Sequence, residues 1–160
     1  MWRIFNESRP SLLDAIIDLL LRPLGQDGGR RYSTASFDLA GDVPLPVEFN
    51  LAESHAVLVV DGTFLQRPEL RPWWDFTVFV ETDERVAEQR GIARDAAHLG
   101  DEELSMRLFA ERYRPAFGLY TGEVDPNANA DAVLDNNDFN SPSLQLRDRP
   151  GQEKATSALG

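Results

Sequence analysis

The chain has 160 residues and a net charge of −11, and its 42% hydrophobic and 27% charged residues are typical of a soluble globular protein. This excess of acid argues against an electrostatic nucleic-acid binder, and the absence of cysteine excludes disulfides and thiol chemistry. The longest apolar run, residues 15–21, is interrupted by Asp18 and is too short to cross a bilayer. The first ten residues lack the pattern of a secretory signal. We therefore expect a cytoplasmic protein that binds neither nucleic acid nor membrane.

The first part of the chain predicts one helix followed by extended and irregular segments. Residues 11–22 repeat leucine and isoleucine at helical spacing, and Pro23 ends the pattern. The glycine-rich residues 25–31 predict a turn. Residues 32–39 alternate roughly between polar and apolar, which is typical of a short strand or an extended loop. Residues 40–53 contain two prolines and a glycine and predict a loop.

The sequence AVLVVDGTFL, residues 56–65, is the stretch on which the predicted fold depends. Residues 56–60 are all apolar and do not alternate, which predicts a strand buried on both faces and hence a parallel sheet. Asp61 stands at the carboxyl end of this predicted strand, where ligands of open α/β sheets bind. It could hold the magnesium ion of a phosphate-transferring enzyme. The alternative is a core strand whose last residue starts a turn, and this stretch taken alone favours the alternative.

Strands and helices alternate in the second half of the chain. Residues 76–81 predict a second buried strand, and Thr82 or Asp83 is positioned to cap the helix that follows. The remaining predicted elements are a helix over residues 84–98, a helix over residues 101–114 and a strand over residues 131–135. This alternation predicts α/β architecture with right-handed crossovers. We expect one α/β domain over residues 1–139 and a poorly ordered polar tail over residues 140–160.

The order of these motifs resembles that of the uridine kinase and phosphoribulokinase group of P-loop kinases, and bacterial uridine-kinase-like proteins are the most similar. The resemblance covers residues 12–138. It is carried by three stretches: VLVVDGTFL, WDFTVFVETDERVAEQRGIARD and ERYRPAFGLYTGEVDPNANADAVLDNND. It implies a P-loop NTPase-like three-layer fold, in which helices flank a mainly parallel sheet. It also implies transfer of a phosphoryl group from ATP, with Mg²⁺, to a hydroxyl of a nucleoside or similar small molecule.

Three residues are assigned catalytic roles by the resemblance. Asp61 matches the acid that ends the family's Walker-B-like strand and helps to hold Mg²⁺. Arg90 and Arg94 match arginines of the lid helix, which closes over the phosphates. Their chemistry suits this role, because a guanidinium is always charged and binds phosphate oxygens with several donors at once. The alternative is a solvated helix face on which these arginines pair with Glu88 and Asp95.

Five further residues are assigned binding roles by the resemblance. Tyr32, Phe37 and Asp38 fall in the region that holds the nucleoside acceptor. Asn136 and Asn137 follow the strand whose neighbouring loop lies by the adenine. Each assignment has a structural alternative, because aromatic residues are more often part of a core and an Asn-Asn pair is more often a turn.

The sequence departs from the family at the phosphate-binding loop. A P-loop of the form GxxxxGK[ST] is absent, and the chain contains no Gly-Lys pair and a single lysine, Lys154. The family's first strand, which is central in its sheet, would precede Leu12. We therefore expect a fragment whose true start lies upstream, with little activity and marginal stability, or else a non-catalytic remnant that acts as a binding or partner-interaction protein. Unpaired strand edges would favour a homo-oligomer or a strand-completing partner.

Overall fold

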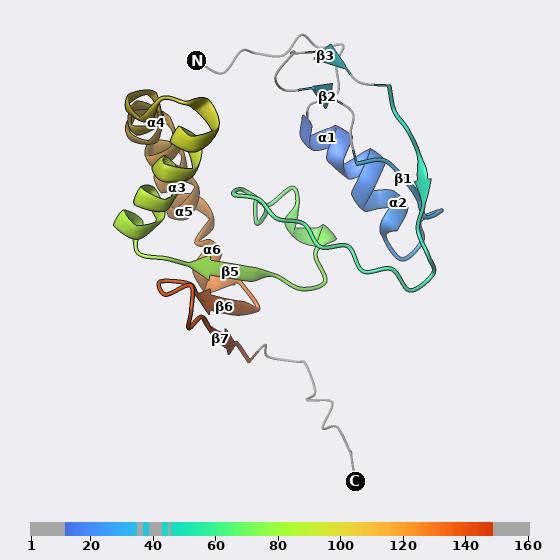
Figure 1. The fold of residues 1–160 in the computed structure, drawn as a ribbon. Coiled ribbons are helices and arrows are strands. Elements are labelled where there is room, and N and C mark those ends of the chain that lie inside the picture. The colour runs from blue at the N-terminus through green and yellow to red at the C-terminus, as the bar shows by residue number, and fades with distance from the viewer. Residues whose placement is uncertain (1–11, 35–36, 39–42, 45, 149–160) are drawn as a thin grey trace. The chain divides into compact units, whose positions relative to one another are not determined.

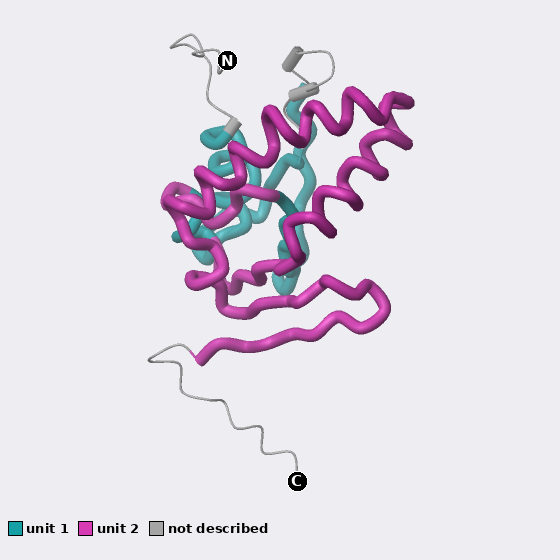
Figure 2. The backbone as a smooth tube through the Cα atoms, turned by 90° about the vertical axis from the view of Figure 1, so that its left-hand side faces the viewer, with its two compact units in different colours: residues 1–62, 70–73 teal, residues 63–69, 74–160 magenta. Residues whose placement is uncertain are grey.

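The computed structural model describes residues 12–34, 37–38, 43–44 and 46–148. The chain divides into two compact units, one formed by residues 1–62 and 70–73 and the other by residues 63–69 and 74–160 (Figure 2). Each unit has its own helices and strands. Within the described residues, no helix is both long and apolar enough to span a membrane.

The first unit begins with a helix and continues through short antiparallel ladders. The helix consists of α1 (Leu12–Ile16), a π-helical segment (Ile17–Leu21) and α2 (Arg22–Leu24). This confirms the predicted helix, although Pro23 lies inside its last turn instead of ending it. Two ladders follow, in which β1 (Arg31–Tyr32) pairs with β4 (Asn50–Leu51) and β2 (Phe37–Asp38) pairs with β3 (Val43–Pro44).

The predicted central strand at residues 56–60 is wrong. These residues form neither helix nor strand, and the side chains of Val57 and Val59 are each 86% exposed. A five-residue apolar run becomes a buried strand only where neighbouring strands cover it, and no described strand pairs with it. The prediction of a mainly parallel sheet is wrong for the same reason. The described sheets are small and contain one parallel strand pair, so the fold is mixed α/β.

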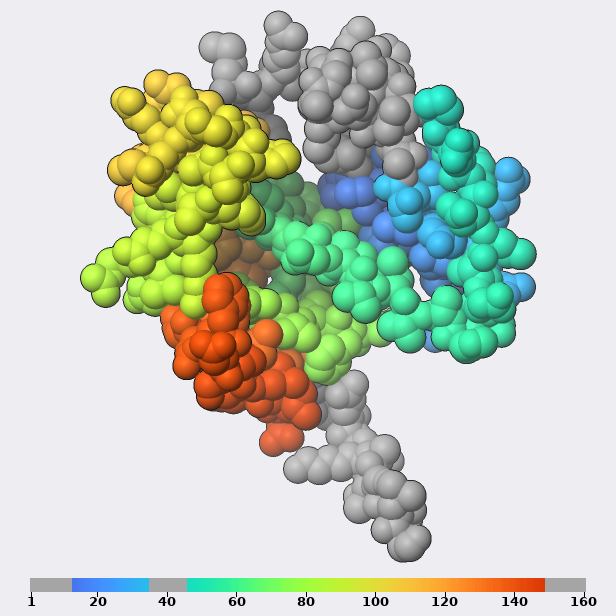
Figure 3. Space-filling view, in the orientation of Figure 1, coloured from blue at the N-terminus to red at the C-terminus, as the bar shows by residue number. Residues whose placement is uncertain are grey.

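The second unit is built around a three-stranded sheet with the order β5-β6-β7 (Figure 1). Strand β5 (Val78–Glu81) runs parallel to β6 (Ala132–Asp135), and β7 (Ser143–Leu146) runs antiparallel to β6. These results confirm strands in the two predicted regions, but the prediction that the first of them is buried is wrong, because Val78 and Val80 of β5 are exposed. The third strand lies beyond residue 139, the predicted end of the folded domain. Its leucines, Leu144 and Leu146, are exposed, and the orange-red atoms of β7 lie open at the surface in Figure 3.

Helices connect β5 to β6, and their ends follow local sequence signals. They are α3 (Glu84–Leu99), α4 (Glu102–Leu108), a π-helical segment (Phe109–Tyr113), α5 (Arg114–Val124) and α6 (Pro126–Asn129). Asp83 is the N-cap of α3, where its side chain accepts bonds from two backbone N–H groups. Gly100 ends α3 at φ +73°, a conformation that glycine adopts without strain. Asp101 caps α4 in the same way as Asp83 caps α3. These features confirm the starts of both predicted helices, but the predicted end of the second at residue 114 is wrong, because α5 continues the helical path through Pro115 to Val124.

A buried carboxylate fixes the start of the parallel pair. Asp131 is 4% exposed, and its Oδ2 accepts hydrogen bonds from the backbone N–H of Thr77 at 2.7 Å and from the Thr77 hydroxyl at 2.8 Å. In return, the Thr77 carbonyl accepts bonds from the N–H groups of Asp131 and Ala132. These bonds join the residues immediately before β5 and β6, and so set the register in which Val78 faces Ala132.

Candidate functional site

The carboxyl ends of β5 and β6 carry a polar cluster that includes three of the predicted site residues. Arg90 of α3 donates from Nη1 to the Asn136 carbonyl and from Nη2 to the Asn137 carbonyl, both at 2.6 Å. The guanidinium carbon of Arg90 lies 3.7 Å from the centroid of the Phe139 ring. We call Arg90, Asn136, Asn137 and Phe139 the Arg90 cluster. It lies at the edge where ligands of α/β sheets bind.

Asn137 holds the loop of this cluster in place with both its backbone and its side chain. Its Oδ1 accepts a bond from the backbone N–H of Asp83 at 2.7 Å, which ties the start of α3 to the loop after β6. Its backbone N–H and Nδ2 donate to Oδ1 of Asp135 at 2.9 Å and 2.8 Å. These two bonds, the backbone one first, hold the pKa of Asp135 below its ordinary value, because they stabilise the carboxylate.

We expect Asn137→Ala to raise the pKa of Asp135 part of the way back to its ordinary value. The substitution removes the side-chain bond and keeps the backbone bond, so the rise should be incomplete. A lowered folded-state pKa stabilises the fold above the unfolded value of 3.8, and this contribution is lost as the pH falls through the folded value. A carboxyl-carbon NMR titration measures the pKa directly. Asn140→Ala is the control, because the backbone rather than the side chain of Asn140 bonds within this loop; equal pKa values in wild type and Asn137→Ala would contradict the assignment.

Arg94 has a different environment from Arg90, although the two lie four residues apart on one helix. Its Nε donates to Oδ1 of Asp95 at 2.8 Å, and its side chain is 76% exposed. The hydrogen bond and then the charge of Asp95 raise the pKa of Arg94. The predicted alternative of a pairing with Asp95 is therefore confirmed for Arg94. Glu88, the other acid in that alternative, forms its ion pair with Arg114.

The remaining predicted site residues lie in the first unit. Asp61 follows residues 56–60 in exposed irregular chain, so no strand positions its carboxylate. Tyr32 is half-buried in β1. Phe37 and Asp38 form β2, and their side chains lie outside the described part of the structure.

The described residues do not supply a site for the magnesium ion that the resemblance implies. Nowhere among them do three or more histidine, cysteine, aspartate or glutamate side chains gather where they could hold a metal. Asp61 alone offers one carboxylate, and the sequence contains no Gly-Lys pair to cradle the phosphates that normally complete a magnesium site. The assignment of Asp61 to a magnesium ion therefore stays a prediction.

Comparison of the chain with family models, with curated proteins and with solved structures found no match in any of the three. The resemblance to uridine-kinase-like proteins therefore stays a prediction from the motifs and their order along the chain.

Two contributors to the site region were missed from the sequence. Phe139 was not assigned a role, although a lone aromatic residue in a polar loop after a strand is a recognisable signal for a ring that contacts a cation or a ligand. The bond from Asp83 to Asn137 was also missed, because it joins residues 54 apart and no local pattern encodes it.

Proposed function

We propose that this chain takes part in ATP-dependent phosphoryl transfer of the uridine-kinase type, with a nucleoside or similar small hydroxyl compound as acceptor. The supporting observation is the Arg90 cluster, which combines a helix-borne arginine, two loop asparagines and an aromatic ring at the carboxyl ends of a parallel strand pair. This is the edge at which α/β proteins bind nucleotides. The motif order points to the same chemistry.

In this proposal Arg90 binds phosphate oxygens of ATP. Its two bonds to carbonyl groups use only part of its N–H donors, so the guanidinium can donate further hydrogen bonds to a second partner. A phosphate would also compete with the carbonyl groups, because a charged acceptor forms the stronger bond. Binding would then loosen the tie between α3 and the loop after β6, which couples nucleotide binding to movement of the helix that the resemblance identifies as a lid.

ATP should bind at the Arg90 cluster, and Arg90→Gln should weaken this binding about tenfold or more, because a hydrogen bond to a charged group contributes ~1.5–3 kcal/mol. The measurement is an NMR titration of the full chain with ATP, followed at the backbone amides of residues 136–139. Arg107→Gln is the matched control, since it removes the same charge from an exposed arginine of α4 that has no assigned binding role. Phe139→Leu keeps the cation and removes the ring, and should have a smaller effect.

Two results would overturn the proposal: amides that do not shift at millimolar ATP, or equal losses of affinity in Arg90→Gln and Arg107→Gln. Phosphoryl transfer to uridine needs a test separate from that of ATP binding. Because the 160 residues contain no Gly-Lys pair, we expect uridine phosphorylation by this chain to stay at the level of a blank without protein. Turnover clearly above that blank would show that the chain holds ATP phosphates by other means.

A second candidate is a non-catalytic protein that acts by associating with a partner, and exposed apolar residues favour it. In the second unit, Val78, Val80, Leu144 and Leu146 share one face of the sheet by register, and all four are exposed. In the first unit, residues 56–59 are apolar and solvent-exposed. Such surfaces promote association with a second copy or with a strand-donating chain. Sedimentation of the ATP-titration samples at two protein concentrations distinguishes this candidate, which requires a defined complex.

A further inference from the structure

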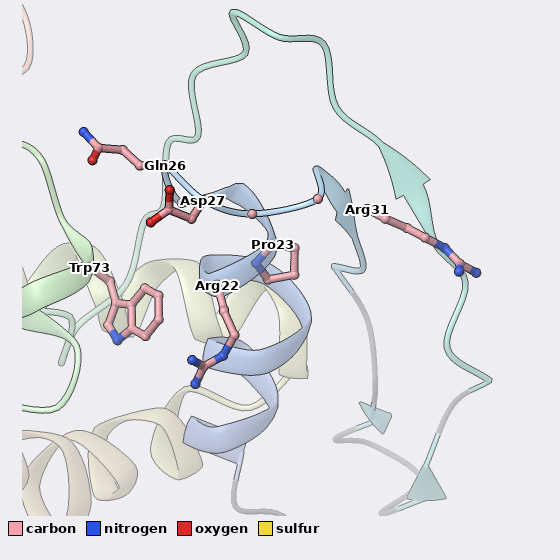
Figure 4. A pocket seen from close by; sticks show the side chains of 9 residues that line it. Arg22, Pro23, Gln26, Asp27, Arg31 and Trp73 are labelled. Carbon is pink, nitrogen blue, oxygen red and sulfur yellow. The ribbon is translucent and has the colours of Figure 1, made fainter.

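The first unit contains an open pocket of about 580 Å³ in which none of the predicted site residues takes part (Figure 4). Its walls are the end of α2 with Arg22 and Pro23, the glycine-rich loop over residues 25–29, and the ring of Trp73. Arg31 lies at its outer rim. This volume is in the range of small-molecule sites.

The loop that forms one wall is held in a single shape. Gly28 donates its N–H to the Gly25 carbonyl and Arg30 donates its N–H to the Pro23 carbonyl, both at 2.9 Å. Arg30 has φ +58°, an unfavourable value for a residue with a side chain, and its guanidinium anchors it by donating to the Ala52 carbonyl at 3.1 Å. A Cβ at Gly28 would overlap the carbonyl group of Pro23, so this position requires glycine. A ligand would therefore meet a preformed wall, and little ordering would oppose binding.

The chemistry of the pocket combines a flat apolar ring with a cation. The guanidinium carbon of Arg22 lies 5.4 Å from the centroid of the Trp73 ring, whereas Arg31 lies 4.3 Å from the Phe49 ring and extends away from Trp73 in Figure 4. Arg22 is therefore the cation that faces Trp73, and the half-buried ring itself lines the pocket. Asp18 pairs with Arg22 at 3.2 Å, but both side chains are more than half exposed, so this pair is weak.

We infer that this pocket binds a planar aromatic phosphate, of the class of the nucleoside monophosphates. The aromatic ring stacks on Trp73, and the phosphate binds the guanidinium of Arg22 beside the glycine-rich loop. Arg22 is the cation beside Trp73, and Asp27 is the one acid among the lining residues. The inference does not depend on the proposed phosphotransferase function, because the Arg90 cluster contributes no residue to this pocket.

The test uses the full chain and three probes: uridine monophosphate, uridine and inorganic phosphate. NMR follows the indole N–H of Trp73, assigned with Trp73→Phe, and the amides of residues 25–29. Uridine monophosphate should shift these signals, and the other two probes should bind at least about tenfold more weakly, because each supplies only one of the two contacts. Equal binding of inorganic phosphate and uridine monophosphate would overturn the stacking contact, and with it the inference.

Variants then separate the guanidinium from general charge effects. Arg22→Gln should weaken binding of uridine monophosphate about tenfold, whereas Asp18→Asn should strengthen it, because Asp18 competes with the phosphate for the same guanidinium. Arg67→Gln, which removes an arginine from outside the pocket, should bind as the wild type does. The inference fails if Arg22→Gln binds as tightly as Arg67→Gln, or if Trp73 does not respond to millimolar uridine monophosphate.

Discussion

Asp131→Ala should lower the free energy of unfolding by about 3 kcal/mol, because it leaves two buried donors of Thr77 without their acceptor. Asp131 is 4% exposed and Thr77 is 9% exposed, so water cannot replace the lost carboxylate easily. The bonds lie where β5 and β6 begin, and the loss should therefore affect the whole three-stranded sheet. Urea unfolding of the full chain, followed by far-UV circular dichroism, gives the change.

Two further variants show whether the acceptor or the negative charge matters. Asp131→Asn retains an oxygen that can accept both bonds from Thr77, so it should cost about 1 kcal/mol, well below the alanine variant. Asp138→Ala removes an exposed carboxylate whose bond to the Asn140 N–H lies in solvent, and should cost no more than about 0.5 kcal/mol. Similar losses in Asp131→Ala and Asp138→Ala would contradict the anchoring role of Asp131.

The start of α3, its end and the start of α4 were predictable from sequence because their signals are local, whereas the continuation through Pro115 into α5 was not predicted. Asp83 and Asp101 accept bonds from N–H groups two or three residues further along the chain, and Gly100 needs only its own backbone freedom. Strand β6 was also found, since Ala132 and Val133 are buried as an unbroken apolar run suggests.

Residues 56–60 show where this reasoning stops. Their composition resembles that of β6, yet Val57 is 86% exposed and Val133 is 7% exposed. The difference lies in the neighbours, since β6 is paired on both sides and residues 56–60 have no described strand beside them. Strand pairing depends on contacts far apart in sequence, so an apolar run alone does not determine it.

The candidate site shows the same distinction between local and distant contacts. Spacing places Arg90 and Arg94 on one helix face, but their partners differ. Arg94 pairs with Asp95, the next residue along the chain, as the sequence alternative suggested. Arg90 bonds to carbonyl groups 46 and 47 residues away, and backbone carbonyls carry no sequence signal. The contact between Arg90 and the Asn136-Asn137 loop was therefore not predicted, because residue chemistry does not encode it.

Gly91→Ala should destabilise the second unit, although alanine is normally the better helix former. A Cβ at position 91 of α3 would overlap Cζ of Phe109 and lie 2.7 Å from its Cε1. Phe109 cannot turn aside freely, because its ring packs edge-on against Tyr113 with the centroids 5.0 Å apart. Overpacking of this kind costs about 1–3 kcal/mol, which outweighs the gain of ~1 kcal/mol expected from replacing a helical glycine.

Gly118→Ala in α5 isolates the effect of helix propensity, because nothing lies within 4 Å of the Cβ it would add. This variant should stabilise the protein by about 0.5–1 kcal/mol in the same urea experiment, so the two alanine substitutions should have opposite signs. In Gly91→Ala/Phe109→Leu the smaller side chain should relieve the overlap, and the double variant should be more stable than the two single losses added together. Strict additivity, or a stabilising Gly91→Ala, would mean that the contact between α3 and Phe109 tolerates a methyl group. Gly91 would then not be required for the close approach of these two segments.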